Sequence, residues 1–457
     1  MDDQQPLSTN QQPCPPGSRF PLLPGVRSRF VQTERLVQHV YESGPDDGEP
    51  LLLVHGNANS GRFFEELMVA LPSYHVVAPD HRGYGASEAK VADATRGLRD
   101  YSDDLEALVQ TLGWQRFHLL GWSLGGNIAM QYVVDHPERV QTLTLHATGS
   151  PFGFGGTHGA DGAPNFDDFA GSGGGRLISP PAIERYLAKD DTADSPFAPR
   201  SLLRTLTVKP TFTFDPVREN ILVEQMLLMA IGDQQYPGDG FPSPNWPFSA
   251  PGLYGSNNAL SPKYCNLSTL GALRGGPPIL WVRGADDQIV SDAALIDPAN
   301  LGKLGAIPGW PGDDVCPPQP MIAQIRAVLD RYRAGGGDYI EHVFPDGGHS
   351  PLFEKADEFR ALFTAFRAAH AVGDVATIAP VAAASAEPEP APGAEGTPAP
   401  VTEQAVEQAA PAAEPAPAPV AEAAPRAEVA PVPAVEQPVP VPSRPQRRRL
   451  FSFFRRG

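Results

Sequence analysis

The sequence Gly121-Trp122-Ser123-Leu124-Gly125 decides how this chain is interpreted. It follows the apolar run 117–120, which predicts a strand, and opens the segment 124–135, whose apolar residues have helical spacing. A serine at a sharp strand-to-helix turn is exposed, and the start of the helix offers N–H donors to negative charge. Because a serine hydroxyl needs a base to act as a nucleophile, this turn predicts a catalytic Ser123 if a base and an acid follow other strands.

Strands and helices alternate on both sides of this turn. Residues 28–33 and 36–43 predict a β-hairpin. Further strands are expected at 51–55, 75–79, 140–145, 279–283 and 339–343, and helices at 63–71, 104–112, 182–188, 217–231, 321–334 and 355–369. Short apolar strands separated by helices indicate an α/β fold with a mostly parallel sheet and helices on both faces.

Two later turns supply the expected base and acid. His349 follows the strand 339–343, and imidazole is the side chain that titrates near neutrality without perturbation. Asp286 and Asp287 follow the strand 279–283, and a carboxylate would fix the tautomer of His349. The chain order Ser, Asp, His is the order expected when all three lie at the carboxyl edge of such a sheet.

An earlier turn, His55-Gly56-Asn57, also follows a strand. A tetrahedral oxyanion needs two donors placed beforehand, and the backbone N–H groups of Asn57 and Leu124 are expected to supply them. His55 itself is expected to be structural. Of the other histidines, His39, His136 and His370 are expected at the surface.

From about residue 27 to 370 the chain resembles the α/β-hydrolase fold superfamily, in its lidded serine-hydrolase branch. The resemblance rests on His55-Gly56-Asn57, the stretch 80–87, the turn around Ser123, Gly284-x-x-Asp287 and Gly348-His349. It implies Ser123, Asp287 and His349 as the catalytic residues, because the acid of this family usually stands third after that glycine. Ser123 also separates the chain from dehalogenases and epoxide hydrolases of this fold, which use an aspartate nucleophile.

The α/β rhythm is interrupted twice, and this predicts the domain organisation. We expect a core at 27–149 and 275–370, with a mainly helical and irregular cap insert at 150–274. A second insert, 291–320, looks irregular. The candidates for lining an apolar substrate pocket are aromatic, namely Trp122, Phe152, Phe154, Trp246, Phe248 and Tyr254. The alternative for each cap aromatic is packing within the cap.

The two ends of the chain differ from the core. Residues 1–26 predict a flexible lead. Residues 371–443 predict a disordered linker, since 17 of the 52 prolines lie between positions 380 and 445. Residues 444–457 combine six arginines with Leu450, Phe451, Phe453 and Phe454. Such a motif fits weak binding to a membrane surface, docking to a protein partner, or a solvated tail with no partner.

Composition excludes several classes. A formal charge of −18 argues against nucleic-acid binding by the folded body. No apolar run reaches the roughly 20 residues of a membrane span, and the acidic start of the chain is unlike a signal peptide, so a cytoplasmic location is expected. Three cysteines indicate free thiols, with a pair between Cys265 and Cys316 left open. No metal or cofactor is expected.

The sequence therefore predicts a serine hydrolase that acts on a small-molecule carboxylic ester or lactone through an acyl-enzyme. Hydrolysis of a C–C bond and acyl transfer use the same three residues and stay open. A non-catalytic binding or scaffold protein is the alternative of another class, because a fold alone does not determine the reaction.

Overall fold

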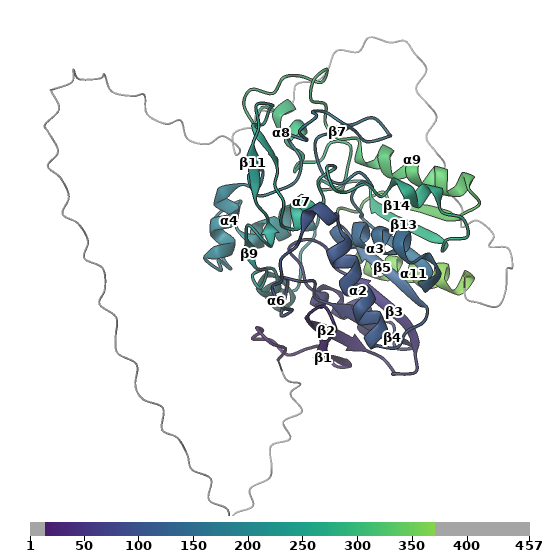
Figure 1. Ribbon diagram of the computed structural model, residues 1–457. Coiled ribbons are helices and arrows are strands. Elements are labelled where there is room, and N and C mark those ends of the chain that lie inside the picture. Colours follow the sequence, from purple (N-terminus) through teal and green to yellow (C-terminus); the bar gives the residue numbers. More distant parts are fainter. Residues whose placement is uncertain (1–13, 371–457) are drawn as a thin grey trace, which may run out of the picture. The chain divides into compact units, whose positions relative to one another are not determined.

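The computed structural model describes residues 14–370. The first 13 residues, the expected linker 371–443 and the basic-aromatic motif 444–457 lie outside the described residues. The fold is built on an eight-stranded sheet in the order β1-β2-β4-β3-β5-β6-β13-β14 (Figure 1). This is the mostly parallel α/β sheet that the sequence predicts.

The strands of this sheet lie within about two residues of the predicted runs. They are β1 (Val26–Gln32), β2 (Val37–Ser43), β3 (Glu49–Val54), β4 (Tyr74–Pro79), β5 (Phe117–Trp122), β6 (Val140–His146), β13 (Ile279–Gly284) and β14 (Tyr339–Phe344). The β1-β2 and β2-β4 pairs are antiparallel, and all other neighbours are parallel. Since β5 is central and buried along its whole length, its carboxyl end places the Ser123 turn in the middle of one sheet edge.

Helices cover both faces of the sheet (Figure 1). They are α1 (Glu65–Val69), α2 (Arg99–Thr111), α3 (Leu124–Asp135), α9 (Met321–Ala334), α10 (Pro351–Glu354) and α11 (Ala356–Ala369). The predicted bounds of α3 and α9 are confirmed. The predicted helix 63–71 begins instead with a 3-10 turn (Gly61–Phe64), which Ser60 caps by accepting a hydrogen bond from the backbone N–H of Arg62.

Residues 150–274 leave the sheet after β6 and return before β13, and we call them the cap. The cap carries mostly short elements: β7 (Thr157–His158), β8 (Ala163–Pro164), α4 (Pro180–Leu187), α5 (Pro199–Leu202), a π-helical turn (Leu203–Thr207), α6 (Pro216–Met226), β9 (Ile231–Gly232), β10 (Tyr236–Pro237), β11 (Gly240–Pro242), β12 (Ser249–Pro251), α7 (Ser256–Ala259) and a 3-10 turn (Ser268–Ala272). Many glycines and prolines keep these elements short.

The second insert, 291–320, is not irregular throughout, because it contains α8 (Pro298–Lys303). It packs on the cap. Trp246 of the cap shares a small hydrophobic cluster with Ala299 and Cys316, and the Trp246 indole donates to the carbonyl of Pro308 at 2.9 Å. The second insert thus packs against the cap, a contact between two inserts that the sequence did not predict.

The start of the described chain is fixed to the core, in contrast to the flexible lead expected from its sequence. Arg62 and Glu65 are fully buried and pair with each other at 3.2 Å. The Arg62 guanidinium also donates to Ser18 Oγ at 2.5 Å, and Glu65 accepts from the backbone of Leu23 at 3.2 Å. A buried ion pair needs such extra partners, so these bonds hold residues 18–23 in place.

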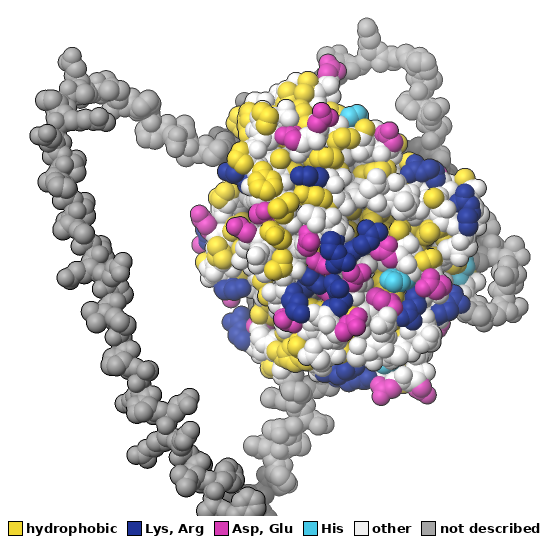
Figure 2. Space-filling view, in the orientation of Figure 1, with side chains coloured by type: hydrophobic (Ala, Val, Ile, Leu, Met, Phe, Trp, Pro, Cys, Tyr) yellow, Lys and Arg dark blue, Asp and Glu magenta, His cyan; other side chains and the backbone are white. Residues whose placement is uncertain are grey.

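Acidic and basic side chains are interspersed over the visible face of the protein (Figure 2). Many charged side chains of the described residues are paired, and some of these pairs lie below the surface. The buried Arg82 donates to both carboxylate oxygens of the buried Asp104 at 2.7 Å, and Arg35 reaches the same carboxylate at 2.7 Å. Within residues 14–370, none of the helices combines the length and the apolar character that crossing a bilayer requires.

Candidate active site

Ser123 stands at a strained turn between β5 and α3. Its backbone lies at φ 56° and ψ −123°, a conformation that residues other than glycine rarely adopt. The glycines beside it are required by crowding. A Cβ on Gly121 would lie 2.2 Å from the carbonyl oxygen of Gly125, and a Cβ on Gly125 would lie 2.1 Å from that of Val54. Glycine at these two positions therefore allows the backbones of β3, β5 and α3 to pack directly against one another at this turn.

The loop after β3 lies against this turn. A Cβ on Gly56 would come within 3.0 Å of the Ser123 Cβ, which places the Asn57 backbone near the serine. Within the described residues, neither the Asn57 N–H nor the Leu124 N–H donates a hydrogen bond to another protein group. Tyr84 and Asn257 hold the Asn57 side chain at 2.6 and 2.8 Å. This geometry suits the two predicted oxyanion donors.

His55 has the structural role expected for it. Its Nδ1 donates to the Gly56 carbonyl at 2.8 Å, and its Nε2 accepts from the His81 backbone at 3.1 Å. Burial, and then the charge of His81, hold the pKa of His55 well below its usual range. Burial likewise lowers the pKa of His81 to about 4. Two neutral imidazoles thus brace the loop that carries Asn57.

The predicted base and acid meet at the carboxyl ends of β13 and β14. His349 Nδ1 lies 2.9 Å from Asp287 Oδ2, and both side chains are buried. The other oxygen, Asp287 Oδ1, accepts from the backbone of Ile289 at 2.8 Å and of Val290 at 2.9 Å. Because a carboxylate only accepts, His349 donates from Nδ1 and keeps Nε2 free as a base.

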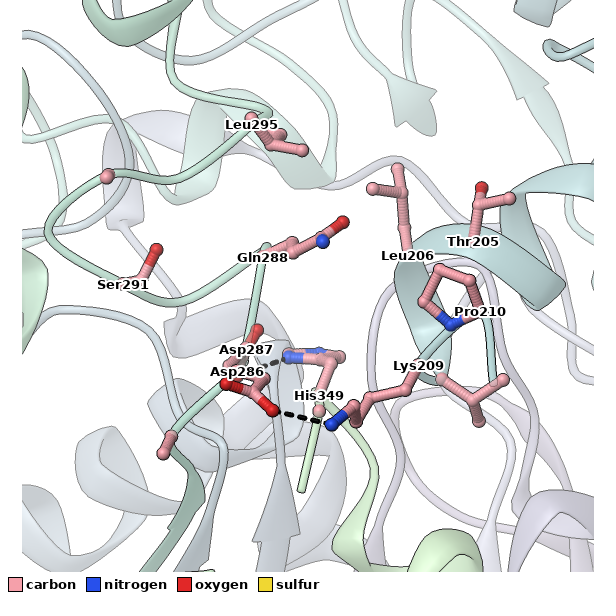
Figure 3. Close-up of a pocket in the computed structure, with 14 residues that line it drawn as sticks. Thr205, Leu206, Lys209, Pro210, Asp286, Asp287, Gln288, Ser291, Leu295 and His349 are labelled. Atoms are coloured by element: carbon pink, nitrogen blue, oxygen red, sulfur yellow. Dashed lines mark hydrogen bonds and ion pairs between the residues drawn. The ribbon is translucent and has the colours of Figure 1, made fainter. Parts of the chain in front are cut away.

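Asp286, the competing acid, points away from the histidine. Its Oδ2 lies 2.6 Å from Lys209 Nζ, and its side chain is half exposed (Figure 3). The two turns are held together through Gly284, where a Cβ would lie 2.1 Å from the carbonyl oxygens of both Gly347 and Gly348. The geometry therefore favours Asp287 over Asp286 as the partner of His349.

Trp122 links the serine turn to the histidine loop. Its indole nitrogen donates to the His349 carbonyl at 3.3 Å, and its ring packs against Phe63, Phe64 and Phe353. The side chain has no exposed surface, so it belongs to the core and does not form the pocket lining suggested by the sequence.

A cavity of about 530 Å³ opens beside His349. Figure 3 shows Thr205, Leu206 and Pro210 of the cap on one side and Gln288, Ser291 and Leu295 of the loop after β13 on the other. Asp286, Asp287 and Lys209 form its floor with the histidine. The cavity is mixed in character, with aliphatic walls and a charged end.

The cap aromatics proposed from the sequence lie elsewhere. Phe152 is buried in the main hydrophobic core, and Phe154 packs against that core. Trp246 is buried in the small cluster with Ala299 and Cys316. Phe248 and Tyr254 are 63% and 37% exposed. The sequence missed Leu206, Gln288 and Leu295, because aliphatic and amide side chains in irregular segments carry no motif.

Within residues 14–370 no group of three or more His, Cys, Asp or Glu side chains is arranged to hold a metal ion. Cys265 and Cys316 are separate buried thiols, and Cys14 is exposed. Burial raises the pKa of Cys265 to about 12, so this thiol belongs to the core and is a poor nucleophile.

Comparison with known proteins agrees with this fold. Residues 49–171 match the model of the family described as alpha/beta hydrolase fold. The chain is 34% identical over 103 residues to a serine hydrolase-like protein of Danio rerio, a match that covers 22% of this chain and 32% of that protein. It is 36% identical over 109 residues to the putative carbamate hydrolase RutD of Variovorax paradoxus, covering 23% and 41%.

The matches thus span less than half the length of these curated relatives. Among solved structures, a putative aryl esterase from Burkholderia cenocepacia is 16% identical with a TM-score of 0.47, covering 75% of this chain and 99% of that one. The family match, the sheet order and the serine turn after the central strand β5 describe one architecture. The described chain therefore has the α/β-hydrolase fold, and its residues 49–171 match the family of that description.

Proposed function

We propose that this protein is a serine hydrolase that cleaves a carboxylic ester or lactone through an acyl-enzyme on Ser123. The observation that carries the proposal is the 2.9 Å bond between His349 and Asp287, at the sheet edge where Ser123 occupies its strained turn. A nucleophile, a base and an acid that fixes the base are the parts that acyl transfer needs.

The reaction proceeds in two halves. His349 Nε2 takes the proton of Ser123 Oγ as the oxygen attacks the acyl carbon, and the N–H groups of Asn57 and Leu124 bind the oxyanion. The imidazolium then gives its proton to the leaving oxygen, and the C–O bond breaks to leave the acyl-enzyme. Water, deprotonated by the same nitrogen, attacks this ester, and the acid departs as Ser123 regains its proton.

The cavity beside His349 supports a substrate with an uncharged apolar part. Leu206, Val208 and Leu295 line it, and its charged end already contains the carboxylates of Asp286 and Asp287. Lys209, the one Lys or Arg side chain among the described residues that line the cavity, is engaged by Asp286 and Asp346. A substrate carboxylate in this cavity would meet like charges without a free cation to bind it.

Burst kinetics with p-nitrophenyl esters of graded chain length test the proposal. We expect a burst equal to the enzyme concentration, and a loss of kcat on the order of 10⁶-fold in Ser123→Ala. A fluorophosphonate probe should label wild type on the tryptic peptide that contains Ser123. A burst followed by little turnover in buffer, with steady turnover and an acylated product when an alcohol is added, would instead favour acyl transfer.

Absence of both turnover and labelling in a folded wild-type protein would reject the serine hydrolase. A p-nitrophenyl ester that is inert beside a vinylogous diketone that is cleaved would identify a C–C hydrolase with the same residues. Each outcome therefore separates one of the alternatives.

A further inference from the structure

A short segment of the cap, residues 207–209, lies against both turns that carry the catalytic acid and base. Lys209 Nζ lies 2.6 Å from Asp286 Oδ2 and 2.6 Å from Asp346 Oδ1. Asp286 immediately precedes Asp287, and Asp346 stands on the loop that leads to His349. One cap side chain thus bridges the two loops, as the dashed line between Lys209 and Asp286 in Figure 3 shows for one of them.

The backbone of the same segment makes further bonds to the histidine loop. Glu354 accepts from the Lys209 N–H at 2.6 Å and from the Gly348 N–H at 2.5 Å. The buried hydroxyl of Ser350 donates to the Thr207 carbonyl. Burial raises the pKa of Glu354, which its two N–H donors oppose. Both neighbours of His349 are therefore linked to the cap. Ser350 bonds directly to Thr207, and Gly348 donates to Glu354, which also accepts from Lys209.

Lys209 also separates like charges. Asp286 and Asp346 belong to different loops, and their side chains are 50% and 72% exposed. The lysine ammonium stands between them and is itself only 20% exposed, so solvent screens it less than the two carboxylates. Asp346 also pairs with Lys355 at 3.1 Å, so removal of Lys209 would chiefly break the bridge to Asp286 beside the Asp287–His349 bond.

We propose that Lys209 is a positioning residue, which sets the spacing of the Asp287 turn and the His349 loop and so holds the catalytic acid and base in bonding distance. This inference rests on the proposed serine hydrolase, since it assigns Lys209 a role in the same site. Lys209 itself touches no reacting atom in this role.

The test compares Lys209→Met and Lys209→Arg with wild type, and with Lys303→Met as the control. Lys303 pairs with Asp313 on the exposed second insert, at 2.9 Å, and lies outside the site. With p-nitrophenyl butyrate, we expect Lys209→Met to lower kcat on the order of 10- to 100-fold per active site titrated by the burst, with KM within about twofold. Lys209→Arg should recover most of the loss, and the control should match wild type.

A second readout does not need turnover. The Nδ1 proton of His349, held by Asp287, should give a low-field proton resonance that Asp287→Asn abolishes and so assigns. We expect this resonance in wild type, Lys209→Arg and Lys303→Met, and its loss or broadening in Lys209→Met. Failure of the proposed function would appear as an inactive wild type with the resonance still present.

Two results would overturn the positioning role. One is an unchanged kcat per titrated site in a Lys209→Met protein that is merely less stable. The other, which applies even to an inactive wild type, is an unchanged resonance in Lys209→Met. An equal loss in Lys209→Arg and Lys209→Met would also overturn it, because the bridge would then not depend on a cation.

Discussion

Asp287 Oδ2 lies 2.9 Å from His349 Nδ1, while its neighbour Asp286 is turned to Lys209. Two adjacent carboxylates in one turn thus have different partners. Backbone donors from Ile289 and Val290 on Asp287 Oδ1 fix that difference.

The first prediction separates these two acids. Asp287→Asn should lower kcat on the order of 10⁴-fold, because the amide no longer holds His349 in the tautomer that leaves Nε2 as the base. Asp286→Asn removes one exposed ion pair and should cost no more than about tenfold. Steady-state kinetics with p-nitrophenyl butyrate measures both. Comparable losses in the two variants would contradict the assignment of the acid.

The second prediction concerns the serine turn. Gly125→Ala would place a methyl group 2.1 Å from the carbonyl oxygen of Val54, which belongs to the core of the sheet. The backbone must shift, so we expect a loss of about 1–3 kcal/mol in the free energy of unfolding and a large loss of kcat. Gly232→Ala is the matched control, since only the end of the Gln235 side chain approaches that position, at 3.6 Å. In urea unfolding experiments, the free energy of unfolding of Gly232→Ala should be close to that of wild type.

The third prediction is acid sensitivity of the fold. Burial lowers the pKa of His81 and of His118 to about 4 from 6.5. Above pH 6.5 both imidazoles are neutral in the folded and unfolded chain. Between about 6.5 and 4 the unfolded chain takes up protons that the folded chain does not, so stability falls as the pH falls.

Each of these two histidines should lower the free energy of unfolding by on the order of 3 kcal/mol as the pH falls from about 6.5 to 4. Urea midpoints at pH 7.5, 6 and 5 measure the effect, and His55 and His146, whose pKa values burial also lowers, act in the same direction. His118→Gln should reduce the slope of stability against pH. A flat profile from pH 7.5 to 5 would show that these imidazoles are not buried as neutral groups.

The fourth prediction concerns the cavity beside His349. Leu206→Trp and Leu295→Trp narrow its two opposite walls, and we expect kcat/KM for long-chain esters to fall by at least about tenfold relative to acetate. Leu304→Trp, at an exposed position directly after α8, is the control for a bulky substitution. Equal changes for short and long esters in all three variants would place the substrate elsewhere.

The core of this protein was predictable because its signals are local and repeated. Apolar strands, helical spacing and glycine turns are all properties of a few neighbouring residues, and α3 and α9 begin and end where their sequences predict. The pairing of His349 with Asp287 was predictable for the same reason, since each residue follows a strand in a fixed order. Their meeting at 2.9 Å follows from the parallel sheet.

The contacts of the cap could not be predicted in this way, because they join residues far apart in the sequence and lie in irregular segments. Trp122 was misplaced, since a bulky residue beside a nucleophile has the same sequence signature whether it faces a pocket or the core. His39 was expected at the surface but is fully buried and bonded to Asp80 at 2.8 Å. Its partner is about forty residues away, beyond the reach of any periodicity.

Trp246 of the cap packs on Ala299 and Cys316 of a segment that follows the next strand of the sheet. The cap is therefore not a module that a single insertion could transfer. A chimaera that received residues 150–274 alone would lack the packing partners of the Trp246 indole. A deletion within 291–320 would remove these partners from the cap, although the two segments are far apart in the sequence. A chimaera that keeps these contacts must therefore exchange residues 150–274 and 291–320 together.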